Sequence, residues 1–261
     1  MNNKPLAFID LDDTIFQTNR RIKPDDSFRV GSLDSKGNPL SFMTKKQQGF
    51  VDWLFTHADV VPVTARPIDG LSRVQLEFKH GAICSFGGTI LDASGKVDAQ
   101  WHEIQEERLK TLKPLIQTMP DLLIENAKGL GDVRSWTVEE NGLKLYSYVK
   151  QNKPQIGQMF LNQIVENIPQ NIKDNFYMHL NGNNLAVIPK VLTKQNAVEY
   201  YLQKHDPESE RFILGFGDSL SDFGFLANCD WFGTPKNSQI RNFTEAQLEA
   251  DYAAKGYFGH D

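Results

Sequence analysis

The chain has 261 residues, of which 40% are hydrophobic and 11% aromatic, and its 33 acidic against 28 basic residues give a net charge of −5. This length suits a core domain with an insertion. The acidic balance argues against a nucleic-acid-binding scaffold, which would carry a basic field. Two cysteines, Cys84 and Cys229, predict buried free thiols in a reducing compartment. Because we find neither a secretory nor a transmembrane stretch, we expect a soluble cytoplasmic protein with no membrane or nucleic-acid partner.

Three short apolar runs each end in a polar residue. They are residues 6–9, followed by Asp10, residues 60–63, followed by Thr64, and residues 211–216, followed by Gly217 and Asp218. Each run is typical of a buried strand of a parallel sheet and is too short for a helix. Ligands bind beyond the carboxyl ends of such strands in open α/β sheets. The three polar strand ends therefore predict one shared site.

Between these strands the pattern predicts helices and one long excursion. Thr44 and Gln47 match a capping box that opens an amphipathic helix, and a second helix is expected over residues 194–203. Residues 15–43 form an irregular excursion with a hairpin turn at 34–39. Because the excursion starts at the end of the first strand, we expect it to overhang the site.

The middle third predicts a second, α+β unit. A charged helix spans residues 103–117, and Pro114 is expected to kink or break it near its end. Two hairpins are indicated around residues 140–142 and 181–183, with a helix over about 155–167 between them. The stretch after residue 243 is polar and is expected to pack loosely.

The strongest chemical signal is the pair Asp10 and Asp12, directly after the first strand. Two carboxylates at this spacing can turn into one crevice, where one acts as a nucleophile and the other manages protons. Phosphate monoesters suit this pair, provided that a hard cation such as Mg²⁺ offsets the negative charges. An acidic loop or a helix N-cap is the alternative interpretation of the pair taken alone.

Other residues supply the missing parts of such a site. Asp218 offers a further acid, and Asp222, one helical turn later, could hold the cation or its ligands, although a capping acid is the alternative. Thr64 offers a hydroxyl and a backbone N–H to a phosphate oxygen, and Lys194 would offset charge on the phosphate and on Asp10. Ser219 is better explained as a cap or turn residue.

The motifs occur in a familiar order along nearly the whole chain: Asp10-x-Asp12-x-Thr14, Thr64, Lys194 and Gly217-Asp218-x-x-x-Asp222. This order resembles the haloacid dehalogenase-like (HAD) hydrolase superfamily, and most closely its large-cap subfamily IIB, the Cof-like and sucrose-phosphatase-like group. The resemblance implies a Rossmann-like parallel-sheet α/β core over residues 1–87 and 188–261. An inserted α+β cap domain of the C2 type would span residues 88–187, close over the site and choose the substrate.

The resemblance also implies roles for individual residues. Asp10 is the expected nucleophile and Asp12 the general acid and base. The phosphate group is expected to meet Thr64, Ala65, Arg66 and Lys194. Mg²⁺ is expected on Asp10, the carbonyl of Asp12 and Asp218, with Asp222 and Ser219 supporting these ligands.

Four features depart from the family pattern. Asp13 replaces the usual Gly, Ser221 stands where many members have Asn, and Gly87 stands where the cap entry usually has Asn. The excursion over residues 15–43 is longer than in typical Cof-like members. These departures remove no catalytic atom.

The predicted function is Mg²⁺-dependent hydrolysis of a small phosphorylated metabolite through an aspartyl-phosphate on Asp10, by a monomer or small homo-oligomer. The resemblance favours a sugar phosphate. The alternatives are a phosphosugar mutase, which shares this core and cap, and a non-catalytic sugar-phosphate sensor. In the cap, Arg134, Trp136 and His179 are candidates for substrate contact, although a surface hairpin also explains them.

Overall fold

The computed structural model describes residues 4–152 and 158–255, and the chain divides into two compact units. Unit 1 comprises Met1–Lys96 and Lys194–Asp261, and unit 2 comprises Val97–Thr193. The sequence placed the boundaries at residues 88 and 187. The first boundary lies later in the structure because strand β7 (Thr89–Leu91) pairs antiparallel with β6 (Ala82–Cys84) and stays with unit 1.

Unit 1 is built on a parallel sheet with the strand order β13-β12-β1-β5. Its strands are β1 (Leu6–Ile9), β5 (Asp59–Pro62), β12 (Ile213–Phe216) and β13 (Trp231–Gly233). All three predicted apolar strands are confirmed. The parallel bridge between Val63 and Ile83 brings β6 alongside the extension of β5.

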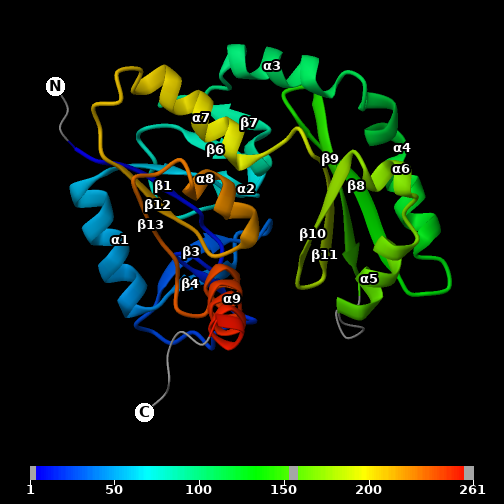
Figure 1. The fold of residues 1–261 in the computed structure, drawn as a ribbon, viewed down its shortest axis with the longest axis horizontal. Helices are drawn as coiled ribbons and strands as arrows, with labels where there is room; N and C mark the ends of the chain where they lie inside the picture. Colours follow the sequence, from blue (N-terminus) through cyan, green and yellow to red (C-terminus); the bar gives the residue numbers. More distant parts are fainter. Residues whose placement is uncertain (1–3, 153–157, 256–261) are drawn as a thin grey trace. The chain divides into compact units, whose positions relative to one another are not determined.

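The central strand β1 is buried on both faces, as expected of a parallel sheet with helices on either side. Ala7 and Ile9 belong to the apolar cluster that includes Val51 of helix α1 (Lys45–His57). Phe8 points the other way and meets the ring of Tyr201, on helix α7 (Lys194–His205), edge to face at 5.6 Å. The helices α1 and α7 therefore flank the sheet (Figure 1).

The predicted capping box of α1 is present, with Thr44 and Gln47 bonding reciprocally. The remaining short elements of unit 1 are α2 (Ile68–Ser72), η1 (Ser85–Gly87), η3 (Leu220–Asp222) and α8 (Phe223–Leu226). The polar stretch after residue 243 that we expected to pack loosely forms most of helix α9 (Gln239–Lys255), whose residues 241–252 are exposed, and residues 256–261 lie outside the described residues.

The excursion after β1 forms a small antiparallel sheet with the order β2-β4-β3. Its strands are β2 (Gln17–Thr18), β3 (Arg29–Leu33) and β4 (Pro39–Met43). The predicted turn is confirmed. The Asp34 carboxylate accepts hydrogen bonds from the backbone N–H groups of Lys36 and Asn38 at 2.8 and 2.9 Å, which fixes the chain reversal.

Unit 2 has an antiparallel sheet with the order β10-β11-β9-β8. Its strands are β8 (Val133–Glu140), β9 (Leu143–Gln151), β10 (Phe176–Asn181) and β11 (Asn184–Pro189). Both predicted hairpins are confirmed. Asn141 and Gly142, with φ of 49° and 80°, form the two-residue turn that the first hairpin requires.

The helices of unit 2 differ from the prediction in one respect. They are α3 (Ala99–Leu109), α4 (Lys113–Asn126), α5 (Gln158–Glu166) and α6 (Gln170–Lys173). The prediction of a single helix over residues 103–117 is wrong, because α3 ends at Leu109 and a separate helix, α4, begins at Lys113. Pro114 is the second residue of α4, in the first turn, where its missing N–H leaves no intrahelical bond unmade. The helix expected over 155–167 corresponds to α5, and residues 155–157 lie outside the described residues.

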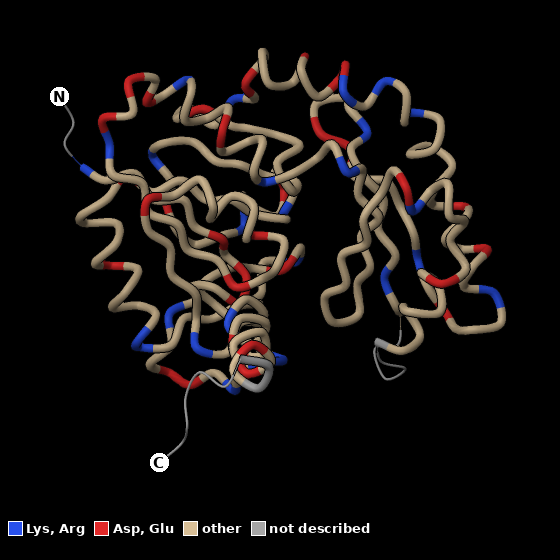
Figure 2. Tube along the Cα trace, in the orientation of Figure 1, with Lys and Arg blue, Asp and Glu red and all other residues tan. Residues whose placement is uncertain are grey.

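Charged residues of both signs are interspersed along the trace of each unit (Figure 2). Within residues 4–152 and 158–255, no helix combines the length and hydropathy needed to cross a membrane.

Candidate active site

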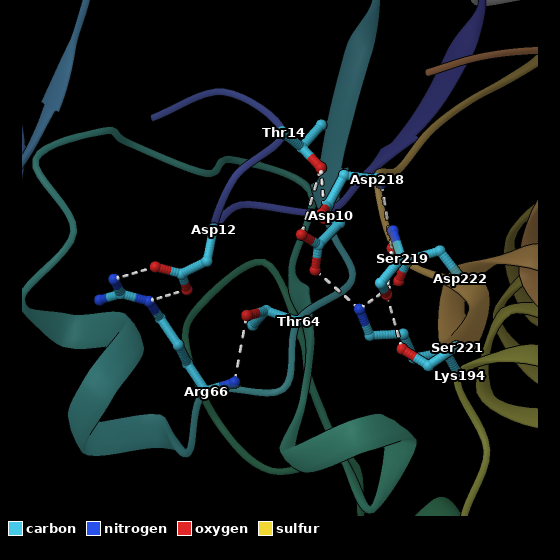
Figure 3. Close-up of polar contacts among 10 residues, drawn as sticks. All are labelled: Asp10, Asp12, Thr14, Thr64, Arg66, Lys194, Asp218, Ser219, Ser221 and Asp222. Carbon is cyan, nitrogen blue, oxygen red and sulfur yellow. Dashed lines mark hydrogen bonds and ion pairs between the residues drawn. The ribbon is translucent and has the colours of Figure 1, made fainter. Parts of the chain in front are cut away.

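The polar strand ends of unit 1 meet at one edge of its sheet, as the sequence predicts. Asp10, directly after β1, donates its backbone N–H to the carbonyl of Phe216, the last residue of β12, at 2.8 Å. This bond places Asp10 beside Asp218. The Thr14 hydroxyl lies 3.3 Å from both the Oδ2 atom of Asp10 and the Oδ1 atom of Asp218, which ties the two strand ends together (Figure 3).

Lys194 enters the same cluster from the first residue of α7. Its Nζ donates to the Oδ1 atom of Asp10 at 2.7 Å and to the Oδ1 atom of Asp222 at 2.6 Å. The Lys194 side chain is only 4% exposed. A lysine at a helix start is usually solvated, so burial between two carboxylates marks Lys194 as part of the site.

Asp222 is fully buried and organises the loop that carries Asp218. Its Oδ2 atom accepts hydrogen bonds from the Ser219 hydroxyl at 2.8 Å and from the backbone N–H groups of Ser219 and Asp218 at 2.9 and 3.2 Å. Gly217 makes this approach possible, since a Cβ atom there would lie 2.7 Å from the Cβ of Asp222. Ser221 extends the network through its hydroxyl, 2.7 Å from that of Ser219.

The buried cluster carries an excess of negative charge. Three carboxylates, those of Asp10, Asp218 and Asp222, face one ammonium, that of Lys194, which leaves a surplus of two negative charges. Burial and the neighbouring carboxylates raise the pKa of Asp218 to about 7, against the opposing effects of Lys194 and Thr14. Burial likewise raises the pKa of Asp10 well above its usual range, despite the opposing charge of Lys194.

The donor set of this cluster fits a hard divalent cation. One oxygen atom from each of Asp10, Asp218 and Asp222 lies within 4.8 Å of the others. Carboxylate oxygens are the ligands that Mg²⁺ and Ca²⁺ take, and a divalent cation matches the surplus charge. Asp222 is fully buried and accepts four hydrogen bonds, whereas Asp10 accepts two and Asp218 one, so Asp10 and Asp218 are the side chains best placed to bind it directly.

Asp12 lies apart from this cluster. Its carboxylate turns to Arg66, which donates from Nε to Oδ2 at 2.6 Å and from Nη2 to Oδ1 at 2.7 Å (Figure 3). The two parallel hydrogen bonds form the bidentate geometry that a guanidinium favours with a carboxylate. The sequence assigned Arg66 to the substrate phosphate, whereas in the structure its guanidinium is engaged with Asp12.

Thr64 closes the turn that leads to Arg66. Its hydroxyl accepts a hydrogen bond from the backbone N–H of Arg66 at 3.1 Å, across Ala65. The Thr64 backbone N–H, which we expected to meet phosphate, instead donates to the Ile83 carbonyl at 2.9 Å. The reason is the parallel bridge between Val63 and Ile83, which continues the sheet past the end of β5.

Asp13 occupies a left-handed backbone position, with a φ of 64°. This conformation explains why glycine is usual there in the family that the motif resembles, and aspartate is one of the residues that tolerate it. The Asp13 carboxylate pairs with Nη1 of Arg21 at 2.9 Å. Arg21 therefore has an acidic partner within the chain, next to the first motif.

The structure adds to the site three residues to which the sequence assigned no role. Thr14 is a member of the first motif, and its spacing from Asp10 could have identified it. Phe16, whose ring centroid lies 5.2 Å from the guanidinium carbon of Arg66, carried no such signal. Neither did Ser32, whose hydroxyl lies 3.2 Å from Nη2 of Arg66.

Within unit 2, the candidate residues lie on one face of the sheet. Trp136, Tyr148, Ala186 and His179 are successive cross-strand partners, so their side chains point to the same side. The Trp136 and Tyr148 rings lie 5.5 Å apart, and Arg134 lies over Trp136 at 5.6 Å.

No protein-family model matches the chain, and no curated protein sequence matches it. Solved structures do match its fold. The C-terminal domain of trehalose-6-phosphate phosphatase from C. albicans is 13% identical, with a TM-score of 0.52 over 99% of this chain and 80% of that one. A trehalose-6-phosphate phosphatase related protein is 15% identical, with a TM-score of 0.51 over 96% and 100% of the two chains.

A haloacid dehalogenase-like hydrolase from Bacteroides thetaiotaomicron is 10% identical, with a TM-score of 0.50 over 95% of this chain and 99% of that one. At these identities the likeness concerns the fold. The chain therefore has the HAD-like α/β fold with an inserted α+β unit, as its motifs predicted.

Proposed function

We propose that the protein is a Mg²⁺-dependent phosphomonoesterase that hydrolyses a small phosphorylated metabolite through an aspartyl-phosphate on Asp10. The observation that carries the proposal is the buried cluster at the strand ends. The Thr14 hydroxyl lies between the carboxylates of Asp10 and Asp218, and Lys194 Nζ donates to Asp10 Oδ1 at 2.7 Å. The second carboxylate of the motif, that of Asp12, lies outside the cluster. This arrangement separates a nucleophile from an acid, as phosphoryl transfer requires.

In the first step, a carboxylate oxygen of Asp10 attacks phosphorus, and the bond from phosphorus to the ester oxygen breaks. For this step Asp12 must carry a proton, so one of its two oxygens has to release its bond to Arg66. Asp12 then gives that proton to the departing oxygen, and the products of this step are the free alcohol and an acyl phosphate on Asp10. Lys194 offsets negative charge on Asp10 and on the transferring group. The Thr64 hydroxyl is the neighbouring group proposed to bind a phosphate oxygen.

In the second step, Asp12 takes a proton from water, and the water oxygen attacks phosphorus. The bond between phosphorus and the Asp10 oxygen breaks, which releases inorganic phosphate and restores both carboxyl groups to their starting states. Asp12 therefore acts as the acid in the first step and as the base in the second, while Asp10 is first the nucleophile and then the leaving group.

The cation would be held by the side chains of Asp10 and Asp218 and by the backbone carbonyl of Asp12. When bound, it supplies positive charge that keeps Asp10 ionised and lets a phosphate dianion approach. The raised pKa of Asp10 and Asp218 supports this requirement, because both carboxyl groups hold protons too tightly in the cluster without added positive charge.

For the substrate, a phosphorylated sugar is the class to test first. The first motif, Thr64, Lys194 and the second acidic motif resemble those of sucrose-phosphatase-like proteins, and solved structures with this fold include a trehalose-6-phosphate phosphatase. The groups described above act on the phosphate and its ester oxygen, so they set the reaction class rather than the identity of the alcohol.

The test is phosphate release from a panel of phosphorylated sugars and other small phosphate esters, with Mg²⁺ and with EDTA, beside the variant Asp10→Asn. We expect release with Mg²⁺ only, and a loss of at least about 10⁴-fold in the variant, whose shape is unchanged but whose nucleophile is lost. Circular dichroism and thermal melting of the variant control for folding.

Release that survives both EDTA and Asp10→Asn would contradict the proposal. Transfer of phosphate between positions of one sugar, without release, would instead favour a mutase. Binding of panel members without turnover would favour a sensor.

A further inference from the structure

The Asp12 carboxyl group owes its position to Arg66, so the supports of Arg66 determine how well Asp12 is placed. Arg66 donates four hydrogen bonds: two to Asp12, one from Nη2 to the Ser32 hydroxyl at 3.2 Å, and one from Nη1 to the Gly70 carbonyl at 3.3 Å. Its side chain is 14% exposed. These bonds leave the guanidinium little donor capacity for a substrate.

The excursion after β1 contacts Arg66 on two sides. Ser32 of β3 bonds to Nη2, and the Phe16 ring lies under the guanidinium, with its centroid 5.2 Å from Cζ. The two contacts are coupled through Gly31, since a Cβ atom at that position would lie 2.7 Å from Cδ1 of Phe16. The backbone of β3 therefore rests on the ring that supports the guanidinium.

Burying the Ser32 hydroxyl costs free energy, and the backbone hydrogen bonds of the sheet do not require a hydroxyl at this position. Ser32 and its cross-strand partner Ser41 are both fully buried, and their hydroxyl groups hydrogen bond to each other. Two small apolar residues would fill the same space without burying polar atoms. An apolar residue at position 32, however, could not accept the hydrogen bond that Nη2 of Arg66 donates to the Ser32 hydroxyl.

We propose that Ser32 is a positioning residue, which fixes the Asp12 carboxyl group for proton transfer by holding the guanidinium of Arg66. The inference rests on the proposed function, in which Asp12 serves the leaving oxygen. In a displacement at phosphorus, the attacking and leaving oxygens lie roughly in line. The carboxyl group that serves the leaving oxygen must then stand apart from Asp10, which is how Arg66 holds it.

The kinetic test compares Ser32→Ala with the matched control Ser41→Ala, which removes the other buried hydroxyl but leaves the bond between Arg66 and Ser32. We expect Ser32→Ala to lower kcat about tenfold with KM nearly unchanged, because a misplaced acid slows the reaction without weakening phosphate binding. Ser41→Ala is expected to keep kcat within about twofold of the parent, since its loss affects stability alone.

A double-variant cycle tests the route through Arg66. In Arg66→Lys the planar fork is lost, so kcat falls, and adding Ser32→Ala to Arg66→Lys should then change kcat little further. Independent, multiplying effects of the two substitutions would overturn the proposal, as would equal kcat values for Ser32→Ala and Ser41→Ala.

A spectroscopic readout decides the inference even if no substrate is turned over. The Nε–H signal of Arg66 in a ¹H–¹⁵N spectrum is identified as the signal that Arg66→Lys removes. We expect Ser32→Ala to shift or broaden this signal, and Ser41→Ala to leave it in place. An unchanged signal in Ser32→Ala would show that Ser32 does not hold the guanidinium. A panel without any turnover would count against the phosphatase proposal alone.

Discussion

Asp10 and Asp12 are two residues apart in the chain but lie in contrasting surroundings. The Asp10 side chain is 8% exposed and belongs to a buried cluster with a surplus of negative charge, held by Lys194, Thr14 and the Asp218 loop. The Asp12 side chain is 34% exposed and forms a bidentate ion pair with the guanidinium of Arg66. The Asp10 cluster therefore needs added positive charge to balance its carboxylates, whereas the charge of Asp12 is already balanced by Arg66.

The two regions also depend on different parts of the fold. The Asp10 cluster is assembled by strand ends and the start of α7, which are fixed by the parallel sheet itself. The Asp12 region is assembled by the turn after β5 and by the excursion that carries Ser32. Substitutions that act on one region and spare the other can separate these two dependencies.

The largest effect is expected from Lys194→Met, which removes the ammonium of the Asp10 cluster. Removing one partner of a buried ion pair lowers the free energy of unfolding by about 3–5 kcal/mol, because the remaining charges stay buried without a partner. Turnover should fall about 10²–10³-fold as well, because the charge on the transferring group is no longer offset. Chemical denaturation and phosphate release measure the two losses.

The control for this variant is Lys46→Met, at an exposed position of α1. It removes the same charge from unit 1 without touching the cluster, so stability and turnover should stay near those of the parent. Equal losses in both variants would mean that Lys194 acts only through the net charge of the protein.

The next effect is a pH dependence that belongs to the Asp10 cluster. Without a cation, the pKa of Asp218 is raised from 3.8 to about 7. The folded state then binds this proton more tightly than the unfolded state, so the stabilisation is fully present below about pH 4 and is lost as the pH rises through about 7. The melting temperature of the metal-free protein should fall over this range, and fall less in Asp218→Asn.

Mg²⁺ should reverse this trend. Binding needs the ionised carboxylates, so Mg²⁺ should raise the melting temperature more at about pH 8 than at about pH 6. Thermal melting with and without the cation checks this expectation. A shift of equal size at the two pH values would argue against a cation in the cluster.

A smaller effect is expected from Gly217→Ala, which places a Cβ atom 2.7 Å from the Cβ of Asp222. Overpacking of this kind costs about 1–3 kcal/mol, and the displaced Asp222 should weaken the hold on Lys194. The matched control is Gly49→Ala in α1, where nothing lies within 4 Å of the added atom. That change should stabilise the protein by about 0.5–1 kcal/mol in denaturation.

The smallest effect on turnover is expected from Gly31→Ala, the corresponding change in the Asp12 region. The new Cβ atom would lie 2.7, 2.8 and 2.9 Å from Cδ1, Cγ and Cβ of Phe16, whose side chain is fully buried. We expect a destabilisation within the same range of about 1–3 kcal/mol. We also expect kcat to fall by about two- to fivefold with KM retained. A rise in KM with unchanged kcat would place the effect on substrate binding instead.

The contrast between the two regions also explains what the sequence could predict. Asp10, Thr64 and Asp218 follow apolar strands, and parallel strands bring their carboxyl ends to one edge, so their meeting was predictable. The partner of Arg66 was not, because it depends on side-chain directions in two turns. Ser32 carries no local signal, since its role appears only when the excursion folds back over Arg66.

The helices likewise combine features that the local sequence predicts with one that it does not. The capping box at Thr44 is local chemistry and was predicted correctly. Pro114 has two outcomes, breaking a helix or beginning one, and the choice depends on where the preceding helix ends. The apolar pattern over 103–117 does not reveal that end, because helices α3 and α4 both carry apolar residues in it.

The central claim is that Asp10 becomes phosphorylated during turnover, and acid-quenched intact mass spectrometry tests it directly. The enzyme is mixed with Mg²⁺ and an aryl phosphate, whose leaving oxygen needs no proton, as the parent and as Asp12→Asn, which lacks the base for the second step. The account predicts a mass increase of one phosphoryl group, larger in Asp12→Asn, mapping to the peptide that contains Asp10. Turnover by the parent with no such adduct in either protein, or an adduct that maps elsewhere, would contradict the account.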